Sequence, residues 1–468
     1  MIQGNIDILA LLPKREADAC RTVAEAVAAA GGRARLVGGC VRDALLGYAP
    51  KDADIEVTGI EAASLEELLR RHFRVETVGR AFGVFILKGL EVDVALPRRE
   101  SKAGSGHKAF VVEGDPWLDP AAAAARRDFT LNAISWDVLS GEIVDPHNGR
   151  DDLRDGVLRH ISAAFSEDPL RVLRAMQFSA RFDFEVAPET VDLCRQIEPE
   201  DLPAERLFEE WAKLIRHGVR PSRGLTFLRD CGWVRYFPEL EALIGCPQDP
   251  EWHPEGDVWT HTLHCMDAFA AARSGDPWED LVVGFGVICH DFGKPSTTFT
   301  DEDGRIRSPG HDITGLEPTE NFLRRLSRHT DLIDAVLPLV ETHMRPAELY
   351  KTQASDSAVR RLARKVRIDR LIRVANADMG GRPPLPADFP AGDWLAQKAE
   401  NLKVADAAPK PVILGRHLID RGYQPGPHFK PILDAAFEAQ LEGEFEDEPG
   451  GQQWLDRYLA TTAYVKTT

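Results

Sequence analysis

The sequence predicts an α/β (α+β) head followed by a mainly α-helical remainder. Helical segments alternate with short strand-like runs up to about residue 145, and after Pro146 the pattern is helical almost throughout. A length of 468 residues, with 43% hydrophobic and 28% charged residues, is typical of a globular protein of more than one domain. We therefore expect the strands to belong to the first part of the chain alone.

Breaks rich in proline and glycine divide the helical part near residues 245–256 and 380–393. We expect four segments: a head over 1–145, a helical neck over 146–245, a helical domain over 246–385 and a helical tail over 386–468. Within the head, the apolar spacing predicts a helix over 17–30 and strands over 34–37, 55–58, 82–88 and 92–96.

Composition excludes several classes of protein. The longest nearly unbroken apolar run, 281–289, is far shorter than the roughly 18 residues that span a bilayer. The N-terminus lacks the pattern of a signal peptide, and the 7 cysteines form no C-x-x-C pair. These features predict a cytoplasmic protein with reduced thiols and no membrane partner. A net charge of -18 argues against a general nucleic-acid binder, although binding follows the local field.

Positive charge is concentrated in a few places, and the densest stretch lies between residues 360 and 373. Two interpretations remain open for it, a solvated helix face or a surface that contacts RNA. Acidic residues gather instead at 438–448. The basic groups are Arg98, Arg99 and Lys102; Arg126 and Arg127; Arg171 and Arg174; then Arg360, Arg361, Arg364, Lys365, Arg367, Arg370 and Arg373.

Two features of the head suit phosphate chemistry. The predicted strand 34–37 leads into Gly38-Gly39 and a helix start, where backbone N–H groups can approach phosphate closely, although Gly-Gly also makes simple turns. Asp52 and Asp54 follow at a spacing that places both on one face of a strand. Adjacent carboxylates repel unless a cation lies between them, and Mg²⁺ prefers such ligands. Solvated acids on an edge strand are the alternative.

Asp93 lies in another predicted strand with apolar neighbours on both sides. A buried carboxylate needs a partner, which is either a shared metal ion or a head arginine.

The residues Gly38-Gly39-x-Val41-Arg42-Asp43-x-Leu45-Leu46-Gly47, followed by Asp52-x-Asp54, resemble the signature of the tRNA nucleotidyltransferase and poly(A) polymerase family, within the polymerase-β-like superfamily. The resemblance implies a polymerase-β-like nucleotidyltransferase head that binds Mg²⁺ through two catalytic aspartates, with a third carboxylate beside them. The residues that it assigns are Asp52, Asp54 and Asp93 for catalysis, and Gly39 and Arg42 for nucleotide binding.

Two further motifs resemble the same family in the same order. The string 126–133 resembles its ribose-binding motif, and 167–171 resembles the amino-acid template that reads the base. A carboxylate accepts from the exocyclic amine of C or A, while arginine donates to ring acceptors. By this resemblance Arg127, Asp128 and Asn132 bind the nucleotide, and Asp168, Arg171 and Arg174 belong to the template helix. The alternative is a set of surface ion pairs of little energetic weight.

The neck holds three further signals. The string Glu205-Arg206 belongs to a later neck motif with a supporting role. Gln177 stands where relatives commonly carry arginine, which puts the exact nucleotide specificity in question. The segment 97–106 corresponds to a flexible loop of the family, and its glycine and serine content predicts mobility.

Histidines and aspartates cluster again between residues 250 and 380. A lone helix histidine is usually structural, but the order His261, His290-Asp291, Asp378 resembles the HD phosphohydrolase superfamily. The resemblance implies that these four residues hold a metal ion, with His311 and His343 as ligands of substrate phosphate or of a second metal. Mixed imidazole and carboxylate ligands suit Ni²⁺, Mn²⁺, Fe²⁺ or Mg²⁺.

A nucleotidyltransferase head in tandem with an HD domain resembles bacterial tRNA nucleotidyltransferases that also act as phosphatases and 2′,3′-cyclic phosphodiesterases. We therefore expect addition of CMP and AMP from CTP and ATP to the 3′ end of tRNA, by two-metal transfer. The alternatives within the class are an enzyme that adds only CC or only A, or a poly(A) polymerase. From other classes, an HD nucleotide phosphohydrolase with an RNA-binding head remains, as does a non-enzymatic tRNA-binding factor, which the charge of -18 disfavours.

Overall fold

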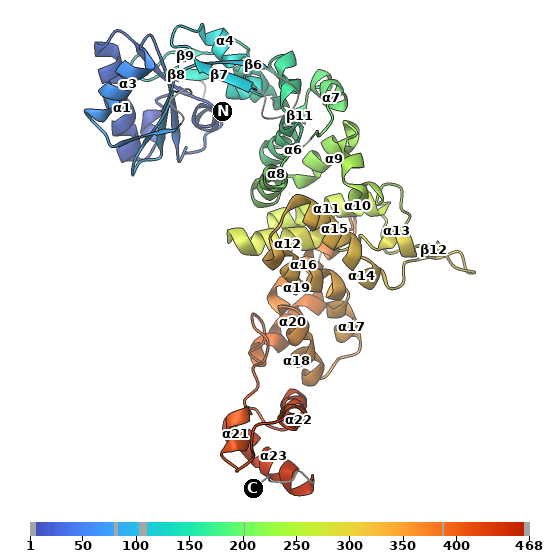
Figure 1. Ribbon diagram of the computed structural model, residues 1–468. Helices are drawn as coiled ribbons and strands as arrows, with labels where there is room; N and C mark the ends of the chain where they lie inside the picture. The colour runs from blue at the N-terminus through green and yellow to red at the C-terminus, as the bar shows by residue number, and fades with distance from the viewer. Residues whose placement is uncertain (1–5, 79–82, 103–109, 201, 386–387, 463–468) are drawn as a thin grey trace. The chain divides into compact units, whose positions relative to one another are not determined.

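The computed structural model describes residues 6–78, 83–102, 110–200, 202–385 and 388–462. The chain divides into two compact units, Met1–Val234 and Arg235–Thr468, which Figure 1 colours from blue to green and from green to red. Each unit is described by itself, and the expected division into four segments stays a prediction. Among the described helices, none combines the length and the apolar character that crossing a membrane requires.

The first unit opens with a mixed seven-stranded sheet in the order β3-β4-β5-β2-β1-β8-β9. Strands β2 and β5 run parallel, whereas the other neighbouring pairs are antiparallel. The strands are β1 (Arg33–Val37), β2 (Ala53–Thr58), β3 (Val75–Val78), β4 (Val84–Leu87), β5 (Val92–Ala95), β8 (Ser135–Asp137) and β9 (Ile143–Val144).

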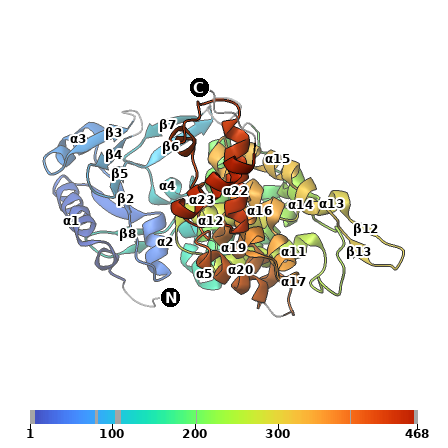
Figure 2. The ribbon, with the colours of Figure 1, turned by 90° about the horizontal axis from the view of Figure 1, so that it is seen from below.

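The two faces of this sheet differ because successive side chains of a strand point to opposite sides. In β2, Ala53, Ile55 and Val57 are buried while Asp54 between them is exposed. Helix α1 (Lys14–Ala29) contacts β1, β2 and β5, and α3 (Ala62–Arg70) contacts β3. Figure 2 shows both helices beside the strands. The acidic side chains therefore lie on the face away from the apolar core.

The main head elements agree with the prediction. Helix α1 begins three residues before the predicted 17–30, and β1, β2, β4 and β5 match the predicted strands, apart from Phe82, which lies outside the described residues. The loop expected over 97–106 is wrong for 98–102, which form β6 (Arg98–Lys102) by antiparallel pairing with β7 (Phe110–Gly114). Backbone pairing with the next strand overrides local composition there. Residues 103–106 of the predicted loop lie outside the described residues.

Helices complete the first unit. Helix α6 packs against both α8 and α9. At Gly224 of α9 a Cβ atom would lie 2.4 Å from the Met176 carbonyl oxygen, so only glycine permits this close approach. The elements after β7 are α4 (Pro120–Ala124), η2 (Thr130–Asn132), α5 (Gly149–Asp155), η3 (Ala163–Glu167), α6 (Leu170–Phe182), α7 (Pro188–Arg195), α8 (Ala204–His217) and α9 (Pro221–Asp230), with a small parallel pair of β10 (Val157–Leu158) and β11 (Glu185–Val186).

The second unit is helical apart from one short hairpin, β12 (Phe299–Thr300) with β13 (Ile306–Arg307). Helices α11, α12, α16 and α19 contact one another around an apolar centre. Its helices are α10 (Pro238–Glu241), α11 (Val258–Ala271), α12 (Pro277–Cys289), α13 (Lys294–Thr297), α14 (His311–Thr314), α15 (Leu316–Leu326), α16 (Thr330–Thr342), α17 (Arg345–Lys351), α18 (Asp356–Lys365), α19 (Ile368–Gly380), α20 (Pro390–Asn401), α21 (Gly415–Ile419), α22 (Phe429–Glu442) and α23 (Glu448–Thr461).

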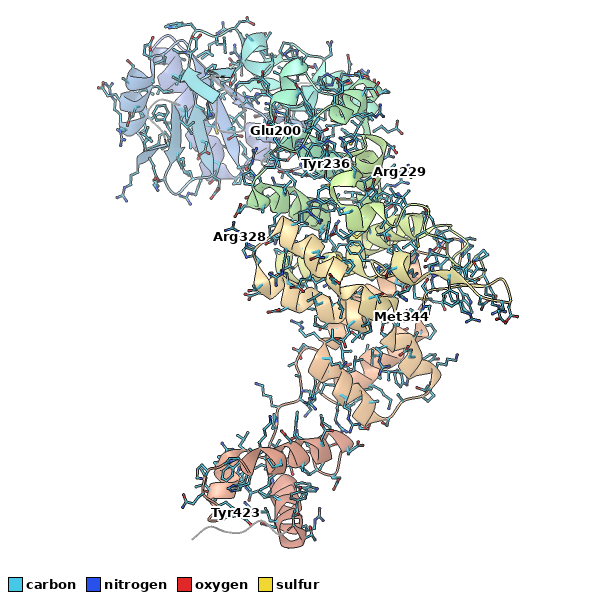
Figure 3. The ribbon with its side chains drawn as sticks, turned by 45° about the vertical axis from the view of Figure 1, so that its right-hand side comes forward. Glu200, Arg229, Tyr236, Arg328, Met344 and Tyr423 are labelled. Carbon is cyan, nitrogen blue, oxygen red and sulfur yellow. The ribbon has the colours of Figure 1, made fainter. Side chains whose placement is uncertain are left out.

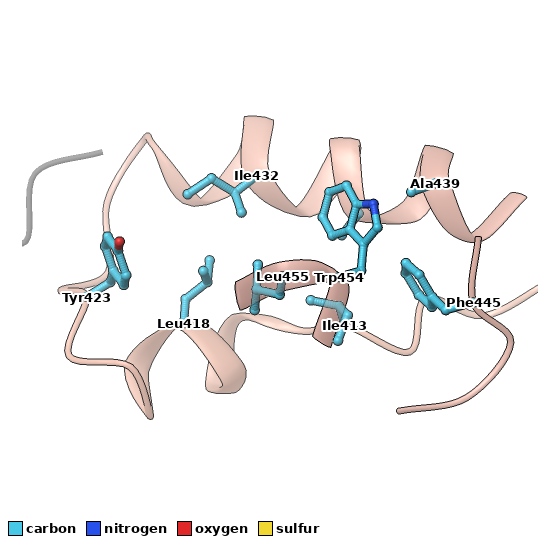
Figure 4. Packing of buried hydrophobic residues seen from close by; sticks show 9 residues of the cluster. Ile413, Leu418, Tyr423, Ile432, Ala439, Phe445, Trp454 and Leu455 are labelled. Carbon is cyan, nitrogen blue, oxygen red and sulfur yellow. The ribbon is translucent and has the colours of Figure 1, made fainter. Parts of the chain in front are cut away.

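The last three helices have a hydrophobic core of their own, shown in Figure 4. Leu418 of α21, Ile432 of α22 and Leu455 of α23 are fully buried in it. Trp454 packs against Phe445 with ring centroids 5.9 Å apart, and its indole N–H donates a hydrogen bond to Glu444.

The basic stretch 360–373 is neither a bare solvated face nor a free positive surface. Its arginines on α18 and α19 form ion pairs with carboxylates of other helices. Arg364 binds Glu438 of α22 at 2.9 Å, and Arg370 binds Glu279 of α12 at 2.7 Å. The further pairs are Arg361 with Glu438 and Glu442, Lys365 with Glu341, Arg367 with Glu279, and Arg373 with Asp280. Much of this charge is therefore balanced within the unit.

Candidate functional site

Three carboxylates meet at the edge of the head sheet. Asp54 of β2 lies directly opposite Asp93 of β5 in the parallel register, and Asp52 precedes β2 by one residue. Partial desolvation and the charges of Asp52 and Asp93 raise the pKa of Asp54 to about 6. Desolvation, Glu91 and Asp52 also raise the pKa of Asp93. Carboxylate charges this close to Asp54 and Asp93 favour a bound cation, so these residues fit Mg²⁺.

Gly38 lies beside these carboxylates at the start of α2 (Gly39–Leu45). Its backbone has φ 75° and ψ -131°, a region that residues with a side chain rarely adopt. A Cβ atom at Gly38 would lie in ordinary van der Waals contact, 3.4 Å from Arg127 Nη1 and 3.7 Å from Asp54 Oδ2. Arg127 is held in place by donating from Nη1 to the Asn132 carbonyl oxygen at 2.9 Å. The backbone conformation, more than the space, therefore explains the glycine at this position.

A cavity of about 450 Å³ gathers most of the predicted nucleotide-binding residues. Asp52 and Asp93 lie outside its lining. Its walls also include Gly38, Arg126 and Arg206, which were not assigned to nucleotide binding. The predicted residues in the lining are Gly39, Arg42, Asp54, Arg127, Asp128, Asn132, Asp168, Arg171 and Arg174.

A chain of hydrogen bonds joins two walls of this cavity. Asp128 is buried and accepts from the Phe129 N–H at 2.8 Å, from Asn132 Nδ2 at 2.8 Å and from Arg174 Nε at 2.7 Å. Asn132 Oδ1 accepts in turn from Arg42 Nη1 at 2.7 Å. Although burial favours the protonated acid, Arg174 and these hydrogen bonds hold the pKa of Asp128 below its usual value. Asp128 thus orients its neighbours on α2 (Gly39–Leu45) and α6.

The alternative for the template residues, an i, i+3 surface pair of Asp168 and Arg171 within one helix, is wrong. Asp168 follows η3 and precedes α6, which contains Arg171. Its Oδ2 accepts from Arg206 Nη2 of α8 at 2.9 Å. Arg171 donates instead to two backbone carbonyls, of Ala164 at 2.9 Å and of Arg126 at 2.8 Å. Arg206 is the residue that sequence reasoning undervalued, and its only signal was the neck motif around it.

Gln177 lies away from the cavity wall. It is 2% exposed on α6, and among the described residues its Oε1 finds no hydrogen-bond partner. The departure from the family pattern thus affects the packed side of the template helix.

The second unit brings all six predicted metal-site residues together. In four histidines of this set, Nδ1 faces a protein oxygen atom, and Nε2 faces the other members of the set. His290, His311 and His343 each direct Nδ1 at a backbone carbonyl three residues earlier, at 2.7, 2.7 and 2.8 Å. His261 directs Nδ1 at Glu255 Oε1 at 2.8 Å. Because a carbonyl or carboxylate can only accept, Nδ1 carries a proton, and in the neutral ring Nε2 then carries the lone pair.

The four Nε2 atoms converge on two carboxylates. His261 Nε2 lies 3.1 Å from Asp378 Oδ1, and His290 Nε2 lies 3.3 Å from Asp291 Oδ2. His311 Nε2 lies 3.5 Å from Asp291 Oδ1 and 3.1 Å from the Nε2 atom of His343. Burial and the neighbouring histidines lower the pKa of His343 to about 4. Lone pairs that face lone pairs require a cation between them, so this donor set fits a divalent metal ion.

A cavity of about 820 Å³ opens beside this cluster. Asp291, His311, His343 and Asp378 line it, and so does the exposed Met344, which Figure 3 labels. Lys294, buried in the wall, pairs with Asp291 Oδ2 at 2.7 Å and donates to Gln248 Oε1 at 2.6 Å. The sequence analysis assigned no role to Lys294 or Glu255; the position of Lys294 three residues after Asp291 was a signal for the first.

Two family profiles match the chain between residues 34 and 244. The profile of the poly(A) polymerase head domain matches residues 34–159, and that of the probable RNA and SrmB-binding site of polymerase A matches residues 183–244. The multifunctional CCA protein of Laribacter hongkongensis is 38% identical over 361 residues, which is 74% of this chain and 85% of that protein. The multifunctional CCA protein of Chromobacterium violaceum is 37% identical over 384 residues, which is 79% of this chain and 90% of that protein.

Solved structures share the fold over nearly the whole chain. The CCA-adding enzyme of Bacillus stearothermophilus in complex with CTP superposes with a TM-score of 0.65 at 24% identity, covering 94% of this chain and 96% of that one. The Thermotoga maritima CCA-adding enzyme complexed with tRNA gives a TM-score of 0.61 at 20% identity, covering 97% and 98%.

Proposed function

Because the chain belongs to the family of the bacterial multifunctional CCA proteins, we infer that it adds CMP and AMP to the 3′ end of tRNA from CTP and ATP, and so completes the CCA end. The observation that carries this conclusion is the head cavity, where carboxylates, arginines and a buried Asn–Asp pair line one space of about 450 Å³. The solved relatives that contain CTP, ATP or tRNA support the same substrates.

Asp52 and Asp54 would hold Mg²⁺ at the head, with Asp93 as the third carboxylate. The bound metal supplies charge neutralisation at the reacting phosphate and at the leaving pyrophosphate. Arg42 and Arg127 on the cavity wall would bind the triphosphate oxygens of the incoming nucleotide.

Asp168 would accept a hydrogen bond from the exocyclic amine that C and A share, and G and U offer no such amine beside an acceptor in the same place. Arg206 contacts both carboxylate oxygens, Oδ2 at 2.9 Å and Oδ1 at 3.5 Å, and the Leu170 N–H donates to Oδ1 at 3.1 Å. The Asp168 side chain therefore keeps a fixed direction in the cavity wall, and its oxygens keep further lone pairs for the base. Arg171 retains a second N–H on each terminal nitrogen for the ring acceptor. Each of these contacts supports selection of CTP and ATP by the protein itself.

We propose a second activity for the unit that follows. The cluster of His261, His290, Asp291 and Asp378 would hold Ni²⁺, Mn²⁺, Fe²⁺ or Mg²⁺ in an HD phosphohydrolase site, with 2′,3′-cyclic phosphodiesterase and phosphatase activity. The bound metal supplies Lewis acidity at the phosphate. Lys294 and the two further histidines, His311 and His343, would contact phosphate oxygens from the cavity wall. We also propose a cytoplasmic location, which the buried free cysteines support.

One pair of variants separates the two activities. We expect Asp52→Ala to abolish CMP and AMP incorporation into tRNA while metal-dependent cyclic phosphodiesterase activity remains. The double variant His290→Ala/Asp291→Ala should lose the phosphodiesterase activity and keep tRNA addition. Loss of both activities in Asp52→Ala would contradict two separate sites. Incorporation that persists in Asp52→Ala would contradict the catalytic role of Asp52. A wild-type protein with phosphodiesterase activity and no nucleotide incorporation would favour the rival assignment, a phosphohydrolase whose head only binds RNA.

A further inference from the structure

Glu255 is a fully buried carboxylate whose visible partners are histidines. It lies in the segment before α11, with its side chain at 0% exposure. Oε1 is hydrogen-bonded to His253 Nδ1 at 2.9 Å and lies 2.8 Å from His261 Nδ1, at ion-pair distance. Oε2 is buried as well, and the described residues offer it no hydrogen-bond partner. A buried carboxylate charge destabilises the folded chain unless the groups that it contacts compensate for its lost hydration.

The outer nitrogen of His261 is treated differently from those of the other three histidines. His290, His311 and His343 rest Nδ1 on neutral backbone carbonyls of their own helical turn. His261 Nδ1 donates to the Gly381 carbonyl oxygen at 3.2 Å and in addition lies 2.8 Å from a carboxylate oxygen of Glu255. A carboxylate on the outer nitrogen fixes the tautomer, orients the ring and makes the inner nitrogen a stronger ligand.

His253 extends the same arrangement to the cavity. It lines the 820 Å³ space, and its ring stands edge-on to that of His261 with centroids 4.7 Å apart. The shared Glu255 oxygen therefore links a cavity-wall histidine to a histidine of the metal cluster.

We propose that Glu255 is a positioning residue of the second unit's metal centre, which holds His261 for metal binding and ties His253 to it. The inference rests on the metal centre proposed above. In the orientation in which Nδ1 lies against Glu255, His261 presents Nε2 to Asp378 at 3.1 Å. The ion itself needs no direct contact with Glu255. The competing explanation is a purely structural group in which a doubly protonated His261 bridges Glu255 and Asp378.

Metal affinity of the full chain separates these explanations. Every sample carries Asp52→Asn/Asp54→Asn, so that bound Mn²⁺ counts the second unit alone. Three proteins are compared on this background: the parent with Glu255, the Glu255→Gln variant and the Glu255→Ala variant. Each is titrated with Mn²⁺ in competition with a chelator, and its metal content is measured after dialysis. Asp280→Asn, which removes a buried carboxylate bound to Ser274 and Arg373 in the same unit, is the matched control. His290→Ala/Asp291→Ala marks the loss of direct ligands.

We expect Glu255→Gln to weaken Mn²⁺ binding by about tenfold or more, and Glu255→Ala by more still. Asp280→Asn should bind as tightly as the parent, and circular dichroism should show all chains folded. The amide variant keeps the shape of the side chain, so it decides the outcome even where the alanine variant fails to fold. Equal Mn²⁺ affinity in the parent and Glu255→Gln would overturn the inference alone. A parent that binds no Mn²⁺ would overturn the proposed metal centre with it.

Discussion

At the scale of single residues, Arg206 determines how Asp168 faces the head cavity. The contact joins Arg206 Nη2 to Asp168 Oδ2 at 2.9 Å, and both side chains lie in the cavity wall. We predict that Arg206→Leu frees Asp168 to rotate and lowers the preference for CTP and ATP over GTP and UTP by about tenfold, the effect of one charge-assisted contact. Arg206→Lys should retain part of the preference.

Single-nucleotide addition with each of the four nucleoside triphosphates measures this preference. Arg216→Leu, on the same helix and outside the cavity lining, is the control. Unchanged discrimination in Arg206→Leu would show that Asp168 is oriented by other groups.

Asp128 contributes to stability through its pairing with Arg174. Replacing it by asparagine leaves the guanidinium with a neutral partner, and because Arg174 is 31% exposed we expect a loss of only about 1 to 3 kcal/mol in the free energy of unfolding. The pKa of Asp128 is lower in the folded chain than its usual value, so its contribution is complete above about pH 4 and is lost as the pH falls further.

Thermal unfolding of wild type and Asp128→Asn at pH 7 and at acid pH tests this. The gap between their midpoints should be wide at pH 7 and should shrink below about pH 4. Asp192→Asn replaces an exposed carboxylate on α7 and should leave the unfolding midpoint unchanged at both pH values. A gap of constant width would mean that Asp128 acts through its shape and not through its charge.

Local spacing explains which site residues could be predicted. Asp52 and Asp54 are two residues apart, so a strand alone brings them together. Arg206 lies 38 residues after Asp168, and only the packing of α6 on α8 makes them neighbours. Glu255 carries no periodic signal because it lies in an irregular segment before α11.

At the scale of elements, β-branched central strands are readable from sequence and short edge strands are not. Strands β1, β2 and β5 are buried runs that alternate or stay apolar, and the sequence predicts them. Strand β9 has two residues, and β6 is ordered by pairing with β7 across a segment rich in glycine and serine. Pairing between distant segments decides such elements.

The contact between α18 and α22 depends on exposed ion pairs. Arg361 and Arg364 meet Glu438 and Glu442, all of them partly solvated. We predict that Glu438→Gln/Glu442→Gln increases hydrogen exchange in α22, because the positive charges of α18 lose their partners. Raising NaCl to about 1 M should also increase hydrogen exchange in α22 of the wild type, and should have only a weak effect on the variant.

Asp434→Gln, a change at an exposed residue of the same helix, is the matched control and should exchange as wild type does. Equal salt sensitivity in wild type and the double variant would mean that the apolar core of the tail carries this contact.

At the scale of the whole molecule, the residues of each candidate site come from one compact unit. The head cavity is built within Met1–Val234 and the histidine cluster within Arg235–Thr468. A substitution in one site can therefore abolish its activity and leave the other activity intact, as the paired variants proposed above are designed to test.

The most direct measurement offers the protein three tRNA transcripts, ending before CCA, after the first C and after the second C. Each is incubated with CTP, with ATP or with both, and the products are resolved at single-nucleotide length. We expect CTP alone to extend the first two transcripts to CC, ATP alone to extend the third by one A, and both together to bring all three to CCA and no further. Extension of the third transcript alone, or addition of A without limit, would contradict a CCA-adding enzyme.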